Sequence, residues 1–86
     1  MEFNVKAEKN SFIVEMAKTK CEKRLEIRYL DLEDPDLLTT NAISSKIKEE
    51  TAKHFECDKV ELVLDHKAEL KVSSIMWDNK KAFESN

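Results

Sequence analysis

The sequence predicts a small α+β domain in which an antiparallel or mixed sheet packs on one helix. Three observations lead to this fold class: short segments in which apolar and polar residues alternate, a proline after the third of them, and then a longer segment with helical spacing. The predicted order is β-β-β-α-β-β, as a single domain over residues 1–86. We expect the polar tail from about residue 78 to be frayed.

The first half of the chain predicts three strands. Apolar side chains occupy alternate positions in Phe3–Ala7, Phe12–Met16 and Leu25–Tyr29, and many of them are aromatic or β-branched. The polar connectors at 8–11 and 18–22 are short enough for hairpins. Because short connectors join neighbouring strands, we expect these strands to pair antiparallel.

One helix is predicted in the middle of the chain. Pro35 interrupts the run of strands, and helical spacing follows over residues 41–55. Ile43, Ile47, His54 and Phe55 fall near one face of this helix, while the remaining positions are largely polar. That face is expected to cover the sheet.

Two further strands are predicted after the helix. Alternation over 60–64 indicates one strand, Asp65–Lys67 reads as a turn, and alternation over Leu70–Val72 indicates another strand. An apolar cluster at 75–77 precedes the polar tail.

Composition excludes several classes of function. The chain carries 15 basic and 18 acidic residues, a net charge of −3, whereas nucleic-acid-binding domains usually have a basic excess. It contains no glycine, so a phosphate-cradling loop is excluded and we expect no cofactor. No stretch is long and apolar enough to span a membrane, and the N-terminus does not resemble a signal peptide, which predicts a cytoplasmic protein.

The thiols and imidazoles offer one chemical alternative. The candidate soft ligands are Cys21, His54, Cys57 and His66. Only His54 and Cys57 have a plausible spacing, and a Cys–His pair can also generate a thiolate. No orienting acid and no oxyanion loop accompany this pair. We therefore expect free thiols, no metal and no enzyme, with a metal- or thiol-dependent protein using His54 and Cys57 as an alternative.

Two charged segments are candidate binding sites. Residues 29–36 form an acidic cluster that lacks EF-hand spacing and reads as a solvated loop. A small basic patch flanks the second connector and consists of Lys18, Lys20, Lys23 and Arg24. Because such side chains bind phosphates, a nucleic-acid-binding domain is the other alternative, although Glu22 interrupts the patch.

The phase of the strands predicts a protein-binding surface. Val63 points opposite to its neighbours Leu62 and Leu64, and Ile13 is likewise out of phase in its strand, so both side chains are expected on the outer face of the sheet. Exposed apolar patches often mark protein interfaces, and tryptophan is a frequent anchor of them. The predicted partner-binding residues are Val63, Ile13, His66 and Trp77.

The sequence of residues 12–72, with Phe12–Met16 and Leu25–Tyr29 as a hairpin before the helix, resembles that of ubiquitin-like, or β-grasp, domains. Ile43 and Ile47 resemble the two core positions of the family helix, and Phe55–Leu64 looks like the helix end, link and strand that follow. The resemblance covers residues 12–72 and implies a β-grasp fold with a partner-binding patch at Val63. The terminal Gly-Gly of conjugated members is absent, which implies a binding-type member.

Together these features predict a non-enzymatic protein–protein interaction module, either an adaptor or an inhibitor-like small protein. Its partner would be another protein, bound through a face or an edge of the sheet. A free strand edge is also compatible with a homodimer.

Overall fold

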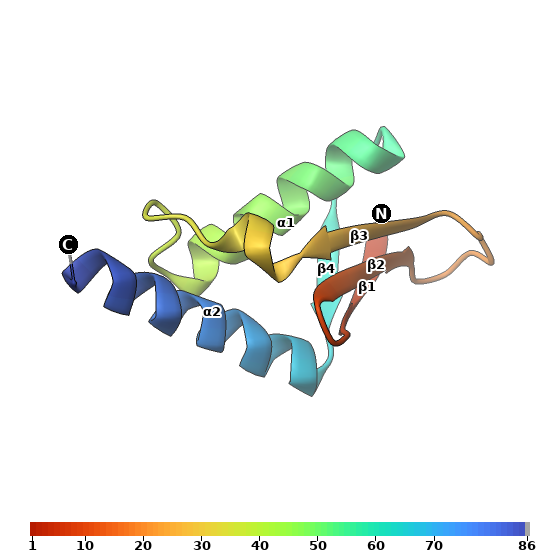
Figure 1. Cartoon of the computed structure of the whole chain (residues 1–86). Helices are drawn as coiled ribbons and strands as arrows, with labels where there is room; N and C mark the ends of the chain where they lie inside the picture. The colour runs from red at the N-terminus through yellow and green to blue at the C-terminus, as the bar shows by residue number, and fades with distance from the viewer. Residues whose placement is uncertain (86) are drawn as a thin grey trace.

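The computed structural model of the protein describes residues 1–85 and shows an α+β domain (Figure 1). Its elements are β1 (Glu2–Ala7), β2 (Ser11–Met16), β3 (Arg24–Arg28), the 3₁₀ helix η1 (Tyr29–Leu32), α1 (Thr40–Phe55), β4 (Glu61–Leu64) and α2 (His66–Glu84). The predicted α+β class is confirmed, but the order is β-β-β-α-β-α.

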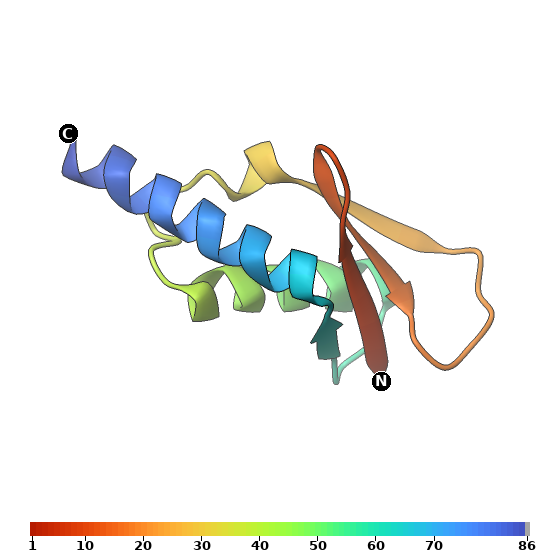
Figure 2. The ribbon, with the colours of Figure 1, turned by 90° about the horizontal axis from the view of Figure 1, so that it is seen from below.

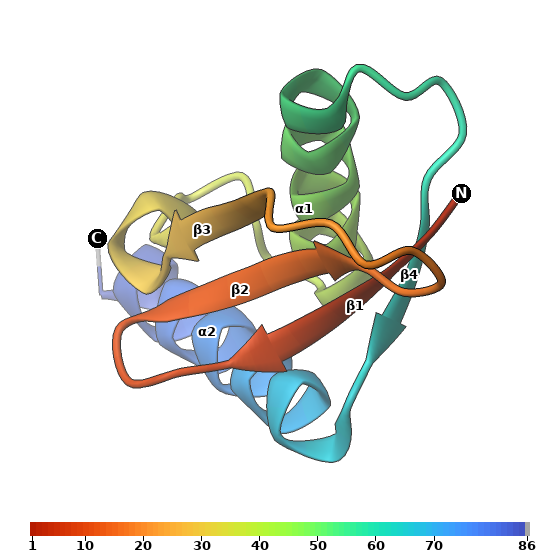
Figure 3. The same cartoon turned by 90° about the vertical axis from the view of Figure 1, so that its right-hand side faces the viewer.

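The sheet is mixed and has four strands in the order β3-β2-β1-β4. β1 pairs antiparallel with β2 and parallel with β4, while β2 pairs antiparallel with β3. Both helices lie behind one face of the sheet, and the other face is uncovered (Figure 3). Seen from below, both helices extend from the sheet in the same direction and are inclined to each other (Figure 2).

The core lies between the covered face of the sheet and the two helices. Alternate strand residues point into it, including Phe3 on β1 and Phe12 on β2, and both are fully buried. Phe3 also contacts Phe55 at the end of α1, with 4.8 Å between the ring centroids. The other buried apolar residues are Val5, Val14, Ile27, Leu32, Ile43, Ile47, Ala68, Val72 and Ile75.

The predicted middle helix is confirmed as α1, but His54 does not lie on its inward face, because the neighbouring Phe55 is buried there and His54 is exposed. Thr39 caps its first turn, because its hydroxyl accepts a hydrogen bond from the Ala42 amide at 3.0 Å. Glu56 ends it in the left-handed conformation with φ 52°, a position that usually holds glycine. Because the chain contains no glycine, a side-chain-bearing residue occupies this position.

The predictions of a turn at Asp65–Lys67 and of a strand at Leu70–Val72 were wrong, because residues 66–84 form the single helix α2. Asp65 is its N-cap rather than part of a turn, since its carboxylate accepts a hydrogen bond from the Ala68 amide at 2.8 Å. The expected strand at Leu70–Val72 lies in this helix, and the expected frayed tail from residue 78 is helical as far as Glu84. The sheet is therefore covered by two helices instead of one.

The alternation of Leu70 and Val72 is misleading because only one of the two faces the core. Val72 is buried, whereas Leu70 lies in solvent. The inward positions of α2 are Ala68, Val72, Ile75 and Asn79, at spacings of four, three and four residues. This is the period of an α-helix rather than of a strand.

Candidate functional site: the outer surface of helix α2

The four predicted partner-binding residues lie on two separate surfaces. Val63 and Ile13 are on the uncovered face of the sheet, because Val63 pairs with Asn4 and Ile13 pairs with Lys6 on β1. β1 therefore lies between them, with polar side chains in the gap. His66 and Trp77 belong to α2, behind the opposite face of the sheet.

The uncovered face of the sheet is mostly charged. Val63 is 47% exposed and Ile13 is half-buried, so little apolar surface is available there. Arg24 on β3 forms an ion pair with Glu15 on β2 across this face, at 3.4 Å. A surface of this composition is well hydrated.

A different apolar surface lies on α2. Leu70 and Trp77 are each 57% exposed, and they are seven positions apart, which is close to two helical turns. Both therefore point away from the core on one side of the helix. His66 lies one turn before Leu70 on the same side and is exposed. We call His66, Leu70 and Trp77 the α2 stripe.

Short and charged neighbours keep the α2 stripe accessible. Ser73 and Ser74 occupy the turn between Leu70 and Trp77 and are too small to cover either side chain. Lys80 lies over the indole, with its Nζ 5.1 Å from the ring centroid, in a cation–π contact. The indole thus has a cationic neighbour, and Trp77 is still more than half exposed.

A basic groove borders Leu70. Its cavity volume is about 320 Å³, and its walls come from the β1–β2 turn, Tyr29 and the first half of α2. The basic residues lining it are Lys9, Lys67 and Lys71, and Glu8 is the acidic one. The surroundings of Leu70 therefore carry an excess of positive charge.

Tyr29 is one of the residues that line this groove. Its hydroxyl donates a hydrogen bond to the backbone carbonyl of Glu8, and the Nζ of Lys71 lies 4.4 Å from its ring centroid. Partial burial raises the pKa of the Tyr29 phenol above 10.0, and the negative charge of Glu8 raises it further. The phenol stays neutral over the physiological range.

The predicted metal- or thiol-binding residues do not form a common site. The Cys57 thiol donates to the Lys59 carbonyl at 3.0 Å, and the His54 ring stacks edge-on against Phe55. Cys21 is exposed in the β2–β3 connector. Within residues 1–85, no group of three or more His, Cys, Asp or Glu side chains is arranged to hold a metal ion.

The basic patch lies on the β2–β3 connector, which extends away from the body of the domain (Figure 1). Lys18, Lys20 and Lys23 are all exposed there. Lys23 lies 5.5 Å from the Phe55 ring centroid, and Arg24 is paired with Glu15. Part of the patch is thus engaged within the domain.

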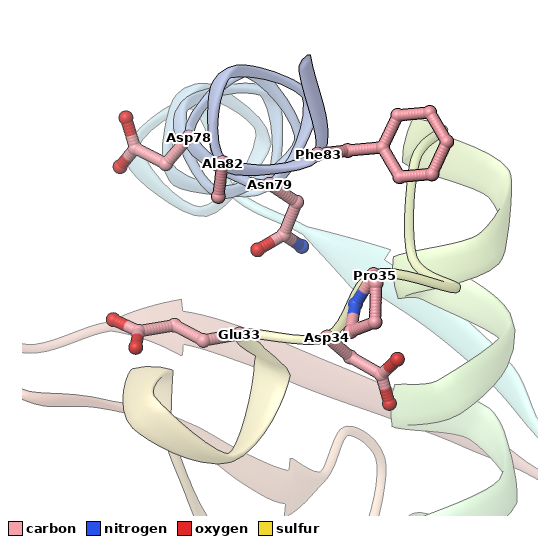
Figure 4. A pocket seen from close by; sticks show the side chains of 7 residues that line it. All are labelled: Glu33, Asp34, Pro35, Asp78, Asn79, Ala82 and Phe83. Carbon is pink, nitrogen blue, oxygen red and sulfur yellow. The ribbon is translucent and has the colours of Figure 1, made fainter. Parts of the chain in front are cut away.

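The acidic segment folds as η1 and the loop that follows. Asp31 pairs with Arg28 at 3.2 Å, and the carboxylate of Asp34 accepts a hydrogen bond from the Asp36 amide at 2.8 Å. The loop forms one wall of a pocket whose other wall is the C-terminal part of α2 (Figure 4). Asn79 lies in that pocket and was not among the predicted site residues.

Leu70 was missed as a surface residue because its segment was assigned to a strand. The signal was present: Ala68, Val72 and Ile75 follow helical spacing after the capping residue Asp65, which places Leu70 on the outward side. Asn79 gave no such signal, since a polar residue near the end of a helix is ordinarily exposed.

The chain matches no protein-family model, and neither curated proteins nor solved structures include a similar one. In the part of the chain that the structure describes, neither helix has the length and apolar character needed to cross a membrane.

Proposed function

We propose that this protein is a non-enzymatic interaction module that inserts the α2 stripe into an apolar groove on a partner protein. The observation that carries the proposal is the pair Leu70 and Trp77, both more than half exposed on one side of one helix. Recognition of an amphipathic helix by a groove uses anchors at such spacings.

The exposed indole is the strongest part of this argument. Burial of apolar surface stabilises a complex by roughly 25 cal/mol per Å², and tryptophan offers more such surface than any other side chain. Trp77 is the only tryptophan in the chain, and it contributes nothing to the core while it remains on the surface. Its burial in an interface would give that apolar surface a function.

The charge around Leu70 indicates the chemistry of the partner. Lys9, Lys67 and Lys71 line the adjoining groove, so carboxylates beside the partner's apolar groove would complement them. Such pairs at the rim of an interface mainly accelerate association and fix orientation. We therefore propose a partner whose apolar groove has an acidic rim.

The uncovered sheet face around Val63 and Ile13 remains an alternative binding surface for the same class of function. Its apolar residues are separated by β1, which makes it a weaker candidate than the α2 stripe. The resemblance to ubiquitin-like domains, with its β-grasp fold and patch at Val63, likewise stays a prediction.

Nucleic-acid binding through the β2–β3 connector is the second candidate function. Its support is the exposure of Lys18, Lys20 and Lys23 on a projecting segment. It predicts binding of DNA or RNA that weakens steeply with salt, whereas no binding at low salt would exclude it.

The proposal is tested by capturing partners from a lysate of the source organism with immobilised wild type and variants. Trp77→Ala and Leu70→Ala alter the α2 stripe, while Val63→Glu alters the sheet face. Leu30→Ala is the matched control, because Leu30 is an exposed leucine (64%) on η1 rather than on α2. Circular dichroism confirms that each variant is folded.

We expect a partner that wild type, Leu30→Ala and Val63→Glu retain and that both α2 variants lose. Loss with Val63→Glu alone would move the interface to the sheet and overturn the assignment to α2. Sedimentation velocity over a range of concentrations tests self-association. A dimer abolished by Trp77→Ala would make a second copy the occupant and contradict the acidic-rimmed partner.

A further inference from the structure

A slot-shaped pocket separates the C-terminal part of α2 from the loop after η1. Its cavity volume is about 460 Å³. Its lining residues are Glu33, Asp34, Pro35, Asp78, Asn79, Ala82 and Phe83 (Figure 4). Pockets of this size bind compact organic groups, and the α2 stripe lies on another side of the same helix.

The charge of the pocket is unbalanced. Three of its lining residues are carboxylates, Glu33, Asp34 and Asp78, and no lysine or arginine lines it. None of the three takes part in the ion pairs formed among residues 1–85. The field inside the pocket therefore favours a positively charged ligand.

Asn79 adds a fixed acceptor inside the pocket. The residue is only 5% exposed, and its Nδ2 donates to the Leu32 carbonyl at 3.0 Å and to the Leu37 carbonyl at 2.9 Å. These two carbonyls determine the orientation of the carboxamide, because the reverse orientation would place oxygen against oxygen. The Oδ1 accepts no hydrogen bond within residues 1–85 and lies on the side facing Glu33 and Asp78 (Figure 4).

We propose that this pocket binds the guanidinium group of an arginine side chain presented by another polypeptide. The carboxylates are not arranged tightly enough for a metal ion, but a guanidinium has five donors in a planar fork that spans more widely spaced acceptors. Glu33, Asp78 and the Asn79 Oδ1 accept its hydrogen bonds. The apolar surfaces of Pro35, Ala82 and Phe83 contact its methylene stem.

The size of the pocket favours a side chain over a free ion. A cavity of about 460 Å³ is larger than a guanidinium group alone requires, so the stem and the flanking backbone have room. This site is separate from the α2 stripe, and it goes beyond the proposed function by adding a second recognition element. If binding at one of the two surfaces is disproved, the proposal for the other surface still stands.

The test is a titration of ¹⁵N-labelled protein with a capped Ala-Arg-Ala peptide, followed by NMR. The chain has five asparagines and no glutamine, so the side-chain NH₂ signals of Asn79 can be assigned readily. We expect these signals and the amides of Glu33 and Asp78 to shift together. Peptides with lysine or with uncharged citrulline in place of arginine should bind more weakly, and citrulline least.

Two substitutions remove charge without changing volume. The double variant Glu33→Gln, Asp78→Asn should weaken binding of the arginine peptide about fivefold or more. Glu84→Gln is the matched control, since Glu84 is an α2 carboxylate outside the pocket, and it should leave binding within about twofold. Equal binding by the double variant, equal binding of the citrulline peptide, or no shift of the Asn79 signals would overturn the proposal.

Binding of methylguanidinium chloride distinguishes two possible ligands, an arginine side chain of a polypeptide and a small guanidinium compound. Because it lacks the stem and the backbone, we expect it to bind more weakly than the arginine peptide. Equal or tighter binding would contradict recognition of a polypeptide side chain and would indicate a small guanidinium compound instead.

Discussion

The two helices share one core but present different surfaces to solvent. On α1 the outward positions are polar, and two of its four-residue steps hold ion pairs, Lys46 with Glu50 at 3.3 Å and Lys53 with Glu49 at 3.5 Å. On α2 the outward positions include Leu70 and Trp77. On their inward faces, both helices place apolar side chains in the common core.

This difference shows that packing within the domain does not explain the outward face of α2. The face of α1 is what a solvated helix needs, since its i,i+4 pairs stabilise the helix slightly and keep it soluble. Leucine and tryptophan give α2 no comparable benefit in water. We propose that a partner covers them, and this is why the proposed function is assigned to α2.

The largest expected effect distinguishes the two faces of α2 itself. Ile75→Ala should lower the free energy of unfolding by about 2–4 kcal/mol, because Ile75 is buried in the core. Leu70→Ala should change it by less than about 0.5 kcal/mol. Urea denaturation measures both, and a similar loss for the two variants would mean that the outward face also supports the fold.

The next effect concerns the attachment of α2 to the rest of the chain. Asn79→Ala removes the hydrogen bonds to the carbonyls of Leu32 and Leu37, leaving both acceptors without this donor. We expect a loss of about 1–3 kcal/mol in the free energy of unfolding. Asn41→Ala is the control, since Asn41 is an exposed asparagine on α1, and it should have little effect.

The N-caps allow a like-for-like comparison of the helices. Thr39→Ala in α1 and Asp65→Ala in α2 each remove one capping hydrogen bond, so each should lower the free energy of unfolding by about 1 kcal/mol. Thermal denaturation followed by circular dichroism tests this. A cap variant with unchanged stability would show that the helix start is held by packing alone.

The smallest expected effect on the free energy of unfolding concerns Tyr29, which lies against Lys71 of α2, and part of it appears only at high pH. The raised pKa of Tyr29 means that its neutral form is favoured in the folded state, so its contribution is fully present below pH 10 and is lost as the pH rises through the folded pKa. Tyr29→Phe should lower stability by about 0.5–1 kcal/mol at pH 7, through the lost hydrogen bond to Glu8, and should remove this alkaline loss. Denaturant midpoints at pH 7 and above pH 10 test both expectations.

The sequence predicted the sheet-forming half better than the end of the chain. Strands β1, β2 and β3 have clear two-residue periods, and α1 has its inward isoleucines four positions apart. The pairing of β1 with β4 could not be predicted, because a parallel contact between strands so distant in sequence depends on the whole fold.

The candidate sites likewise divide into features that a local sequence pattern predicts and features that depend on the whole fold. The outward phase of Val63 was predicted correctly from its neighbours, whereas the partner-binding role of Trp77 stays a prediction. The pocket at Asn79 was not predictable, because it joins the loop after η1 to Asn79, which lies more than forty residues later in the chain. Such sites depend on tertiary contacts that no local pattern records.

The most direct test uses the single tryptophan as its own reporter. Trp77 fluorescence is measured in the free protein and with a purified partner, together with quenching by iodide. We predict an emission typical of exposed indole that iodide quenches in the free protein, and a blue shift with reduced quenching when the partner binds. Binding of the partner with an unchanged emission spectrum and unchanged quenching would contradict the assignment of the interface to α2.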